Sequence, residues 1–376
     1  MPIRISYIFV FLFLFVVFGV GSLTPLINRL SYGGQEVITL QMIYGSEKRG
    51  WIEDVTNDFL EYWAAQHPDT RLEVNFLPMG SRSSLIALVN GVLKPTIWSP
   101  ASSLWVPLAN GLWNEKYGSN IINESTPLVY SPIVIGTWQS YLAKHNITGF
   151  NDLHELAISP QSDLLFAHTD PQESNSGFMA CLLEVTVASG KSNASDLTYS
   201  DLIAERTKQW MTELEAKAVY YGSSTGFLME QAVGRGPGSF NAFVVYENLV
   251  LEKNYGGEPG NRWNDKLVAI YPSEGTLKSD HPFCILDAPW VSSAQKMAAQ
   301  ELKNFLLRED IQSKAMIYGL RPIISSVPLD YSRFSETYGL QANYSSPILV
   351  PPSEENVDSE KSVLRRLPDL WLATRP

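Results

Sequence analysis

Along the first third of the chain, apolar residues recur with two different periods, one typical of strands and the other of helices. Residues 37–43 form a short apolar run, and residues 71–76 alternate apolar and polar side chains, as half-buried strands do. Between them, residues 51–66 carry apolar side chains at helical spacing. A helix over 85–92 and a short strand over 96–98 continue the series. This βαβαβ order predicts a parallel sheet with crossover helices.

The same alternation returns further along, so we predict a second α/β unit inserted into the first. The predicted strands are 128–135, 164–167, 240–246, 267–271 and 283–286, and the predicted helices are 177–188, 202–217, 227–233, 294–307 and 311–318. The predicted fold is therefore α/β with two lobes and mixed sheets. The first lobe would comprise 37–126 plus 272–350, and the second 127–271. Residues 351–376 form a C-terminal extension whose packing the pattern leaves open.

The N-terminal region carries a long apolar run. Residues 5–23 hold no charge, follow Arg4, and are close to the length of one membrane span. Gly19-Val20-Gly21 offers small side chains where a signal peptidase reads them, so a cleaved signal peptide is the rival interpretation. Residues 24–36 form a polar tether in either case. Both interpretations place the rest outside the cytoplasm, either anchored in the cell membrane or secreted.

Composition narrows the choice of partners. The 376 residues carry a net charge of −11, which argues against nucleic-acid binding, because a phosphate backbone requires a basic face. Hydrophobic residues make up 45%, enough for a sizeable core. The two cysteines, Cys181 and Cys284, lie in apolar runs, which favours two separate buried thiols, although the compartment permits a disulfide.

Small and hydroxyl-bearing residues follow each early strand. In parallel sheets ligands bind outside the carboxyl ends of the strands, where helix N-termini favour negative charge. These strand exits predict a site for a small polar solute, with an oxyanion as the leading choice. The first-lobe candidates are Ser46, Ser81, Arg82, Ser83 and Ser99. Helix capping and plain turns are the alternative roles for the serines, and a surface charge is the alternative for Arg82.

The segment TDPQESNSGF at 169–178 predicts the second-lobe half of this clamp, because it leaves an apolar strand and opens a helix. Its candidates are Ser174, Asn175, Ser176 and Gly177, where glycine allows close approach of a ligand. Tyr246, at the end of another predicted strand, is the remaining candidate. Two carboxylates in the segment, at 170 and 173, would repel an anion.

Catalytic signatures are missing from the sequence. The five histidines show no metal-ligand spacing, no Gly-X-Ser-X-Gly elbow occurs, and the glycine-rich run 234–238 lacks the Lys-Ser/Thr of a phosphate-binding loop. His168 lies near Asp170, but a histidine at a strand end is the simpler interpretation. We therefore expect no enzyme activity, no metal and no cofactor.

Seven short motifs occur in a fixed order between about residues 37 and 350. They are 43–48 (IYGSEK), 80–85 (GSRSSL), 95–102 (PTIWSPAS), 170–177 (DPQESNSG), 245–247 (VYE), 271–275 (YPSEG) and 319–322 (GLRP). Their order resembles the type 2 periplasmic solute-binding proteins, particularly the molybdate-binding branch. It also resembles solute-binding-like domains that accompany von Willebrand A modules.

This resemblance implies a two-lobed fold with a ligand cleft between the lobes, and capture of a solute for a membrane permease and its ATPase. It implies that Ser46, Ser81 or Ser83, the amides around 175–177 and Tyr246 hold the solute. The chain departs from the pattern at Thr96, where the family usually carries Asp, and by several tryptophans near the expected cleft, which are more typical of sugar sites. A membrane-tethered sensing or interaction module is the alternative function.

Overall fold

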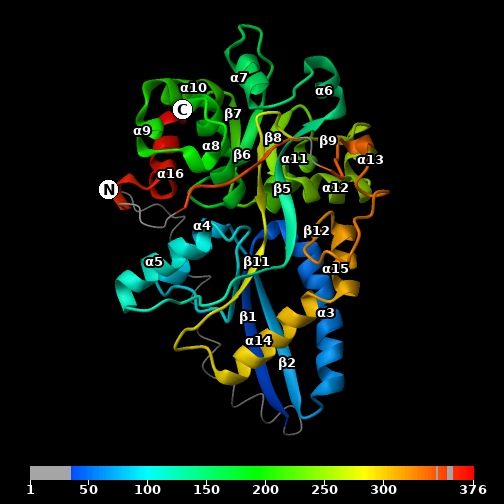
Figure 1. The fold of residues 1–376 in the computed structure, drawn as a ribbon. Coiled ribbons are helices and arrows are strands. Elements are labelled where there is room, and N and C mark those ends of the chain that lie inside the picture. The colour runs from blue at the N-terminus through cyan, green and yellow to red at the C-terminus, as the bar shows by residue number, and fades with distance from the viewer. Residues whose placement is uncertain (1–34, 344–345, 354–358) are drawn as a thin grey trace, which may run out of the picture.

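Two mixed β-sheets, one in each lobe, organise the computed structural model (Figure 1). The structure describes residues 35–343, 346–353 and 359–376. The predicted signal peptide or anchor at 5–23 lies outside the described residues, as does nearly all of the tether. Within the described part of the chain, no helix is both long enough and apolar enough to cross a membrane.

The first sheet has the strand order β2-β1-β3-β11-β4. Its strands are β1 (Glu36–Tyr44), β2 (Thr70–Pro78), β3 (Ile97–Ser99), β4 (Thr126–Pro127) and β11 (Pro282–Ile285). β1 pairs in parallel with β2 and β3, as the βαβαβ pattern predicts, whereas β11 pairs antiparallel with β3 and β4. The helices of this lobe are α3 (Arg49–Gln66), α4 (Ser81–Val89), α5 (Trp105–Tyr117), α14 (Ser293–Leu306) and α15 (Glu309–Ala315).

The second sheet has the order β13-β10-β5-β8-β6-β7, and β9 and β12 also pair with β5. Its strands are β5 (Val129–Trp138), β6 (Phe166–Thr169), β7 (Ala218–Gly222), β8 (Ala242–Tyr246), β9 (Leu267–Ile270), β10 (Thr276–Ser279), β12 (Arg321–Pro322) and β13 (Ile348–Leu349). Its helices are α6 (Gln139–His145), α7 (Phe150–Ile158), α8 (Asn175–Ser189), α9 (Tyr199–Ile203), α10 (Glu205–Glu215), α11 (Thr225–Arg235), α12 (Glu247–Tyr255), α13 (Glu258–Trp263) and α16 (Val363–Thr374).

Helix α8 is the central helix of the second lobe. It is buried on nearly every side, so it shows no polar face, unlike α3, which buries Trp51, Phe59 and Trp63 along one stripe. A helix that is apolar all round belongs inside a protein. Glu184, in the middle of α8, is a charged exception to this rule and is fully buried.

The chain passes between the two sheets at Leu128, again at Asp280 and His281, and once more between α15 and β12, which pairs with β5. β10 still pairs with β5, so residues 276–279 lie with the second sheet, whereas the sequence pattern assigned them to the first lobe. The sequence of this segment, TLKS, has too little alternation of apolar and polar residues to predict a strand.

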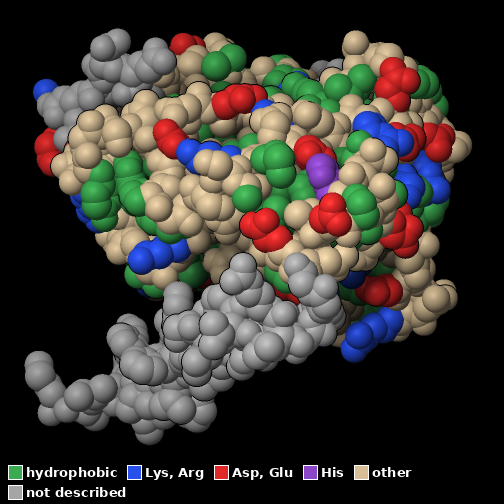
Figure 2. Space-filling model, turned by 90° about the horizontal axis from the view of Figure 1, so that it is seen from below, with side chains coloured by type: hydrophobic (Ala, Val, Ile, Leu, Met, Phe, Trp, Pro, Cys, Tyr) green, Lys and Arg blue, Asp and Glu red, His purple; other side chains and the backbone are tan. Residues whose placement is uncertain are grey.

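The C-terminal extension ends in α16, which packs against α8, α9 and α10 of the second lobe. Arg365 Nη1 also lies 3.6 Å from Glu115 Oε1 on α5, so this helix contacts both lobes. Cys181 and Cys284 are free and buried, which confirms the expectation of two separate thiols. On the end of the molecule seen from below, acidic and basic side chains are interspersed (Figure 2), which is typical of a solvated surface.

Candidate ligand site between the lobes

Polar side chains of both lobes meet where the carboxyl ends of β1 and β3 face the N-termini of α8 and α11 and the end of β8. We call this region the interlobe seam. It comprises Ser46, Glu47, Lys48, Ser81, Ser99, Asn175, Ser176, Ser224, Thr225, Tyr246, Asn248, Ser279 and His281, all of which are buried. The strand exits supply the first-lobe half, as parallel topology requires.

Ser46 joins the lobes directly. It follows β1, and its Oγ lies 2.6 Å from Oγ of Ser224 in the second lobe. The same Oγ accepts a hydrogen bond of 3.0 Å from the backbone N–H of Gly226 at the start of α11. A Cβ at Gly226 would lie 2.8 Å from the Ser46 carbonyl oxygen, so glycine permits this approach. A hydroxyl oxygen of one lobe thus occupies a helix N-terminus of the other.

The N-terminus of α4 makes a second contact of the same kind. The backbone N–H groups of Arg82 and Ser83 both donate to the carbonyl oxygen of Glu173 at 3.0 Å. The Arg82 guanidinium donates to the carbonyl oxygen of Gln172, also at 3.0 Å. A Cβ at Gly80 would lie 2.3 Å from the Glu173 carbonyl oxygen. Arg82 and Ser83 are half-buried at the rim of the seam, and they face backbone carbonyls of the second lobe.

Ser81 and Ser99 lie deeper in the first lobe. Ser81 Oγ accepts a hydrogen bond of 3.0 Å from the N–H of Ala101, which fixes the loop after β3. Ser99, the last residue of β3, is fully buried, and its Oγ has no hydrogen-bond partner within the described chain. An unpaired buried hydroxyl costs free energy, so Ser99 retains a donor for another group.

The start of α8 is held by hydroxyl contacts. Ser176 Oγ lies 2.8 Å from Thr169 Oγ1 and accepts a hydrogen bond of 2.8 Å from Thr225 Oγ1. The Gly177 N–H donates to Thr169 Oγ1 at 2.7 Å. A Cβ at Gly177 would lie only 1.7 Å from the Thr169 carbonyl oxygen, so any other residue would force the backbone to shift. Ser174 precedes the helix as its buried N-cap residue without a side-chain capping bond.

Asn175 connects three elements. Its Oδ1 accepts from Trp105 Nε1 of α5 at 2.6 Å, and its Nδ2 donates to Tyr246 OH at 2.6 Å and to Ser279 Oγ at 3.1 Å. Burial, followed by the nearby Glu47 carboxylate, raises the pKa of Tyr246, so this phenol stays neutral. Trp98 and Trp105 are fully buried, as expected for core packing rather than for exposed aromatic platforms.

The charged part of the seam is a buried triad of Glu47, Lys48 and His281. Glu47 Oε1 lies 3.1 Å from Lys48 Nζ and 3.1 Å from His281 Nδ1. Burial alone would raise the pKa of Glu47, but Lys48 and the hydrogen bond with His281 outweigh it and lower the pKa to about 2. Asn248 Nδ2 donates to the Glu47 carbonyl oxygen at 2.8 Å. His281 has a φ of 42°, an uncommon conformation for histidine, at the crossing between the sheets.

The ten residues predicted from the sequence fall into three groups. Ser46, Ser81, Ser99, Asn175, Ser176 and Tyr246 place side chains in the seam; Ser174 and Gly177 shape the start of α8; Arg82 and Ser83 lie at the rim. The sequence analysis missed Glu47, Lys48, Ser224, Thr225, Asn248, Ser279 and His281. Glu47 and Lys48 directly follow Ser46 in its strand exit, and Ser224 and Thr225 repeat the hydroxyl-rich pattern after β7, so both pairs had a usable signal.

Glu247, which follows β8 in the motif at 245–247, is fully buried. Its carboxylate receives two hydrogen bonds of 2.7 Å from Arg321 and a further one from Tyr271. This bidentate pair fixes the end of β8 beside β12. Glu247 therefore supports the second-lobe side of the seam as a structural residue.

A sequence profile described as "Bacterial extracellular solute-binding protein" matches residues 40–321, which is well over half of the chain. The chain belongs to this family. Membership implies an extracytoplasmic location and a binding function rather than an enzymatic one. The match covers both lobes and every residue of the interlobe seam. No curated protein matches the chain.

Solved structures of solute-binding proteins share the fold, which confirms the predicted type 2 periplasmic-binding-protein architecture. A periplasmic thiamin-binding protein has a TM-score of 0.65 at 15% identity and covers 92% of this chain and 98% of its own. The sulfate-binding protein of Mycobacterium tuberculosis H37Rv has a TM-score of 0.54 at 16% identity, with 82% and 93% covered. A two-component system protein that mediates signal transduction has a TM-score of 0.54 at 15% identity, with 84% and 94% covered.

Proposed function

We propose that this solute-binding protein captures a small oxyanion in the interlobe seam and delivers it to a membrane permease with its ATPase. One observation carries the proposal: oxygen atoms of the protein itself occupy helix N-termini across the seam. The Glu173 carbonyl oxygen accepts hydrogen bonds from two backbone amides of α4, and Ser46 Oγ accepts one from a backbone amide of α11. Helix N-termini are general anion sites, so oxygen atoms of an oxyanion suit the same positions.

On binding, hydrogen bonds between the two lobes would be exchanged for hydrogen bonds to the solute. When the lobes separate, the Ser46 hydroxyl and the amides of α4 and α11 lose their interlobe partners. A solute that supplies oxygen atoms to both sides favours the closed state, because only closure lets both lobes contact it. Ser99 Oγ, buried without a partner among the described residues, adds a donor that the solute can use.

The charges of the seam are compatible with an anion of low charge. Lys48 pairs with the Glu47 carboxylate, and His281, whose pKa is lowered by burial, donates a hydrogen bond to it, so the charge of Glu47 is compensated inside the protein. At the rim, Arg82, Asp170 and Glu173 line a groove of about 460 Å³. Those two carboxylates oppose anions of high charge, and Arg82 counters them in part.

A thermal-shift screen tests the proposal on the full chain in mild detergent. Sulfate, phosphate and molybdate are compared with raffinose, thiamin and amino acids at equal concentration. We expect an oxyanion to raise the melting midpoint, because a ligand at 100 times its Kd stabilises by about 2.7 kcal/mol. Ser46→Ala combined with Ser176→Ala should abolish the shift.

Ser313→Ala is the matched control, since Ser313 is an exposed serine on α15 that bonds only its own helix. Its shift should equal that of the wild type. A screen in which no oxyanion moves the midpoint, or a double variant that keeps the full shift, contradicts the assignment of this site.

The membrane attachment is part of the same proposal. We propose that residues 5–23 hold the protein at the outer face of the cell membrane, or direct its export before cleavage. Mass spectrometry of the mature protein decides between these two, because cleavage removes the N-terminal peptide. Retention of residues 5–23 in the membrane fraction supports the anchor.

A sensing or interaction module is the second candidate, and the closed seam itself favours it. Ser46, Asn175 and Arg82 each take part in a hydrogen bond that joins the two lobes directly. A protein that stays closed would present a constant surface to a membrane partner. Distances between spin labels on the two lobes distinguish the two candidate functions. A distance that changes when a solute is added supports solute capture. A short distance that stays constant with every solute of the screen supports the sensing or interaction module.

A further inference from the structure

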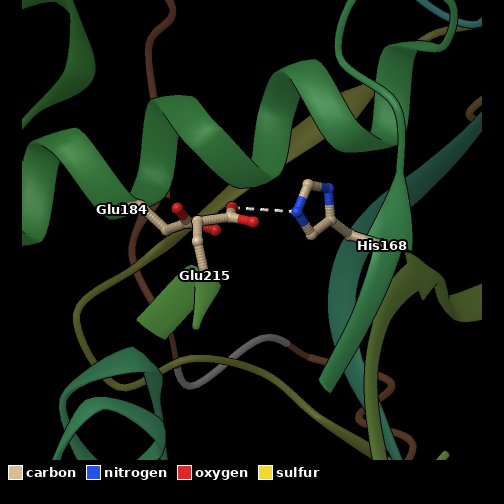
Figure 3. A group of neighbouring side chains, drawn as sticks. All are labelled: His168, Glu184 and Glu215. Carbon is tan, nitrogen blue, oxygen red and sulfur yellow. Dashed lines mark hydrogen bonds and ion pairs between the residues drawn. The ribbon is translucent and has the colours of Figure 1, made fainter. Parts of the chain in front are cut away.

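A second buried polar group lies inside the second lobe. His168 comes from β6, Glu184 from α8 and Glu215 from the end of α10, and the three side chains point toward one another (Figure 3). All three are fully buried. Thr169, the next residue of β6, contacts the start of the same helix α8 through Ser176 and Gly177, whereas His168 faces Glu184 further along it.

The spacing of their polar atoms matches a metal site. His168 Nε2 lies 3.0 Å from Glu215 Oε1, and one ligand atom from each of the three residues lies within 4.8 Å of the others. Ligand atoms bound to one Zn²⁺ ion at about 2.0–2.2 Å lie about 3–4.4 Å from one another.

Outer-sphere hydrogen bonds orient two of the three side chains. His168 Nδ1 lies 2.7 Å from the Thr169 carbonyl oxygen, which fixes a proton on Nδ1 and turns Nε2 toward the two carboxylates. Tyr221 OH donates to Glu215 Oε2 at 2.7 Å, so the other oxygen of that carboxylate faces His168. Metal-binding histidines and carboxylates are usually supported in this way.

The environment of the Glu184 carboxylate is the observation that indicates a ligand. Both of its carboxylate oxygens are buried, and neither has a hydrogen-bond partner in the described parts of the chain. A buried carboxylate without a partner is costly, because water no longer solvates its charge. The residues next to Glu184 in α8, from Phe178 to Leu183 and at Val185, are apolar, so the cluster itself provides its polar neighbours.

We propose that His168, Glu184 and Glu215 bind one divalent transition-metal ion, such as Zn²⁺, at a structural site in the second lobe. One imidazole nitrogen and two carboxylate oxygens form a donor set that such ions accept. Two carboxylates and a neutral imidazole carry a charge of −2, which the ion balances. The ion would connect β6, α8 and α10 beneath the C-terminal helix.

Protons are the competing way to neutralise this cluster. Burial, followed by the nearby Glu215, raises the pKa of Glu184 to about 8. Burial lowers the pKa of His168, but Glu215 outweighs it and raises the pKa to about 9. A cluster neutralised only by protons would bind no metal, and the experiment below separates the two cases.

Helix α16 covers the cluster. The Trp371 ring centroid lies 5.1 Å from that of Tyr221 and 6.2 Å from that of His168. Because Trp371 and the cluster are fully buried, an ion must enter while the chain folds or when α16 detaches. The test therefore includes a refolding step.

The full chain is unfolded in guanidinium chloride with EDTA, and then refolded in mild detergent with excess Co²⁺ or without metal. After desalting, we expect one tightly held Co²⁺ per chain, visible absorption from its d–d transitions, and a raised melting midpoint. Glu184→Gln, which keeps the shape of the side chain, should weaken binding by about 100-fold or more, so that desalting removes the ion.

Glu213→Gln is the matched control. Glu213 lies on the same helix as Glu215, and its Oε2 is 2.7 Å from His154 Nε2, but that pair is partly exposed and Glu213 is not a member of the proposed site. This variant should retain one Co²⁺. A wild type that refolds without holding the ion overturns the proposal, as does a Glu184→Gln variant that binds like the wild type.

Anomalous X-ray scattering keeps the proposal testable if Glu184→Gln does not refold. Crystals of the wild-type protein refolded with Zn²⁺ should show an anomalous peak between the three side chains. A peak elsewhere, or none, overturns the site.

Discussion

The interlobe seam and the His168–Glu184–Glu215 cluster are both buried and polar, yet they are built in opposite ways. The seam consists mainly of hydroxyls, amides and backbone groups, nearly all of which are hydrogen-bonded, some across the two lobes and some within one lobe. The cluster consists of ionisable groups from one lobe, with an unpaired carboxylate at its centre. Neutral partners can be exchanged for a ligand at small cost, whereas buried charges require a permanent counter-charge.

This difference distinguishes the seam, whose hydrogen bonds can be broken and replaced, from the cluster, whose contacts are fixed. Each neutral hydrogen bond of the seam contributes only about 1 kcal/mol net, so opening breaks several weak contacts rather than one strong one. Glu47 is the charged exception in the seam, and Lys48 and His281 keep it paired. The cluster, by contrast, lies between sheet and helices of one lobe and need not move when the lobes do.

Removing the cover of the cluster should give the largest effect. Trp371→Ala leaves a cavity above His168 and Tyr221, because Trp371 is fully buried. We expect a loss of about 3–5 kcal/mol in the free energy of unfolding, measured by denaturant titration with circular dichroism. Leu372→Ala changes the partly exposed neighbour and should cost far less. Equal losses would show that α16 does not seal the lobe.

Acid should affect the seam through Glu47. Its folded pKa of about 2 lies below its ordinary value of 4.5, so its pairing stabilises the protein above pH 4.5, and this contribution is lost as the pH falls toward 2. The loss is on the order of 3 kcal/mol. Melting midpoints between pH 7 and 2 should fall less steeply for Glu47→Gln than for the wild type. Glu61→Gln, at an exposed position of α3, should follow the wild type, and identical slopes for all three proteins would exclude Glu47 as the cause.

The close backbone approach at α8 gives a smaller effect. Gly177→Ala forces a methyl group toward the Thr169 carbonyl oxygen, so α8 must shift, and we expect a cost of about 1–3 kcal/mol in the free energy of unfolding. Solute-dependent shifts should weaken as well, because the seam depends on this position. At Gly238 a Cβ would meet nothing within 4 Å, so Gly238→Ala should leave both stability and binding close to wild type. A Gly177→Ala protein as stable as the wild type would contradict the tight packing.

The smallest expected effect tests whether a solute can replace the hydrogen bond between the two lobes. A double-mutant cycle of Ser46→Ala and Ser224→Ala should give a coupling of about 0.5–1.5 kcal/mol in stability without solute. A saturating oxyanion should reduce this coupling, because each serine would then bond to the solute. Coupling that stays constant with solute would indicate a fixed lobe contact and favour the sensing module.

Much of the fold was predictable because local patterns and tertiary packing agree. The alternation over β1, α3, β2, α4 and β3 predicted the parallel part of the first sheet, and the hydroxyl-rich exits predicted one edge of it as a binding edge. Helix α5 and helix α16 were not predicted. α5 contains Pro107 and Asn110 between its apolar residues, and α16 contains Pro368, so both patterns are interrupted by residues that ordinarily break or weaken a helix.

The candidate site was predicted only in part, for a physical reason. Ser46 and Ser176 lie in segments whose local chemistry is visible, since both directly follow a strand or open a helix. His281 comes from the crossing between β10 and β11, where the neighbouring sequence says nothing about a partner at Glu47. Long-range pairing of this kind leaves no periodic trace.

The sequence by itself determined the α/β class, the order of most elements, the hydroxyl-rich strand exits and the buried state of both thiols, because each depends on local periodicity and residue type. Only the tertiary structure decided that Ser46 meets Ser224, that Glu47 is paired by His281, and that His168 joins Glu184 and Glu215 beneath Trp371. Those contacts join residues far apart in the chain, and the sheets that bring them together are set by global packing rather than by neighbouring residues.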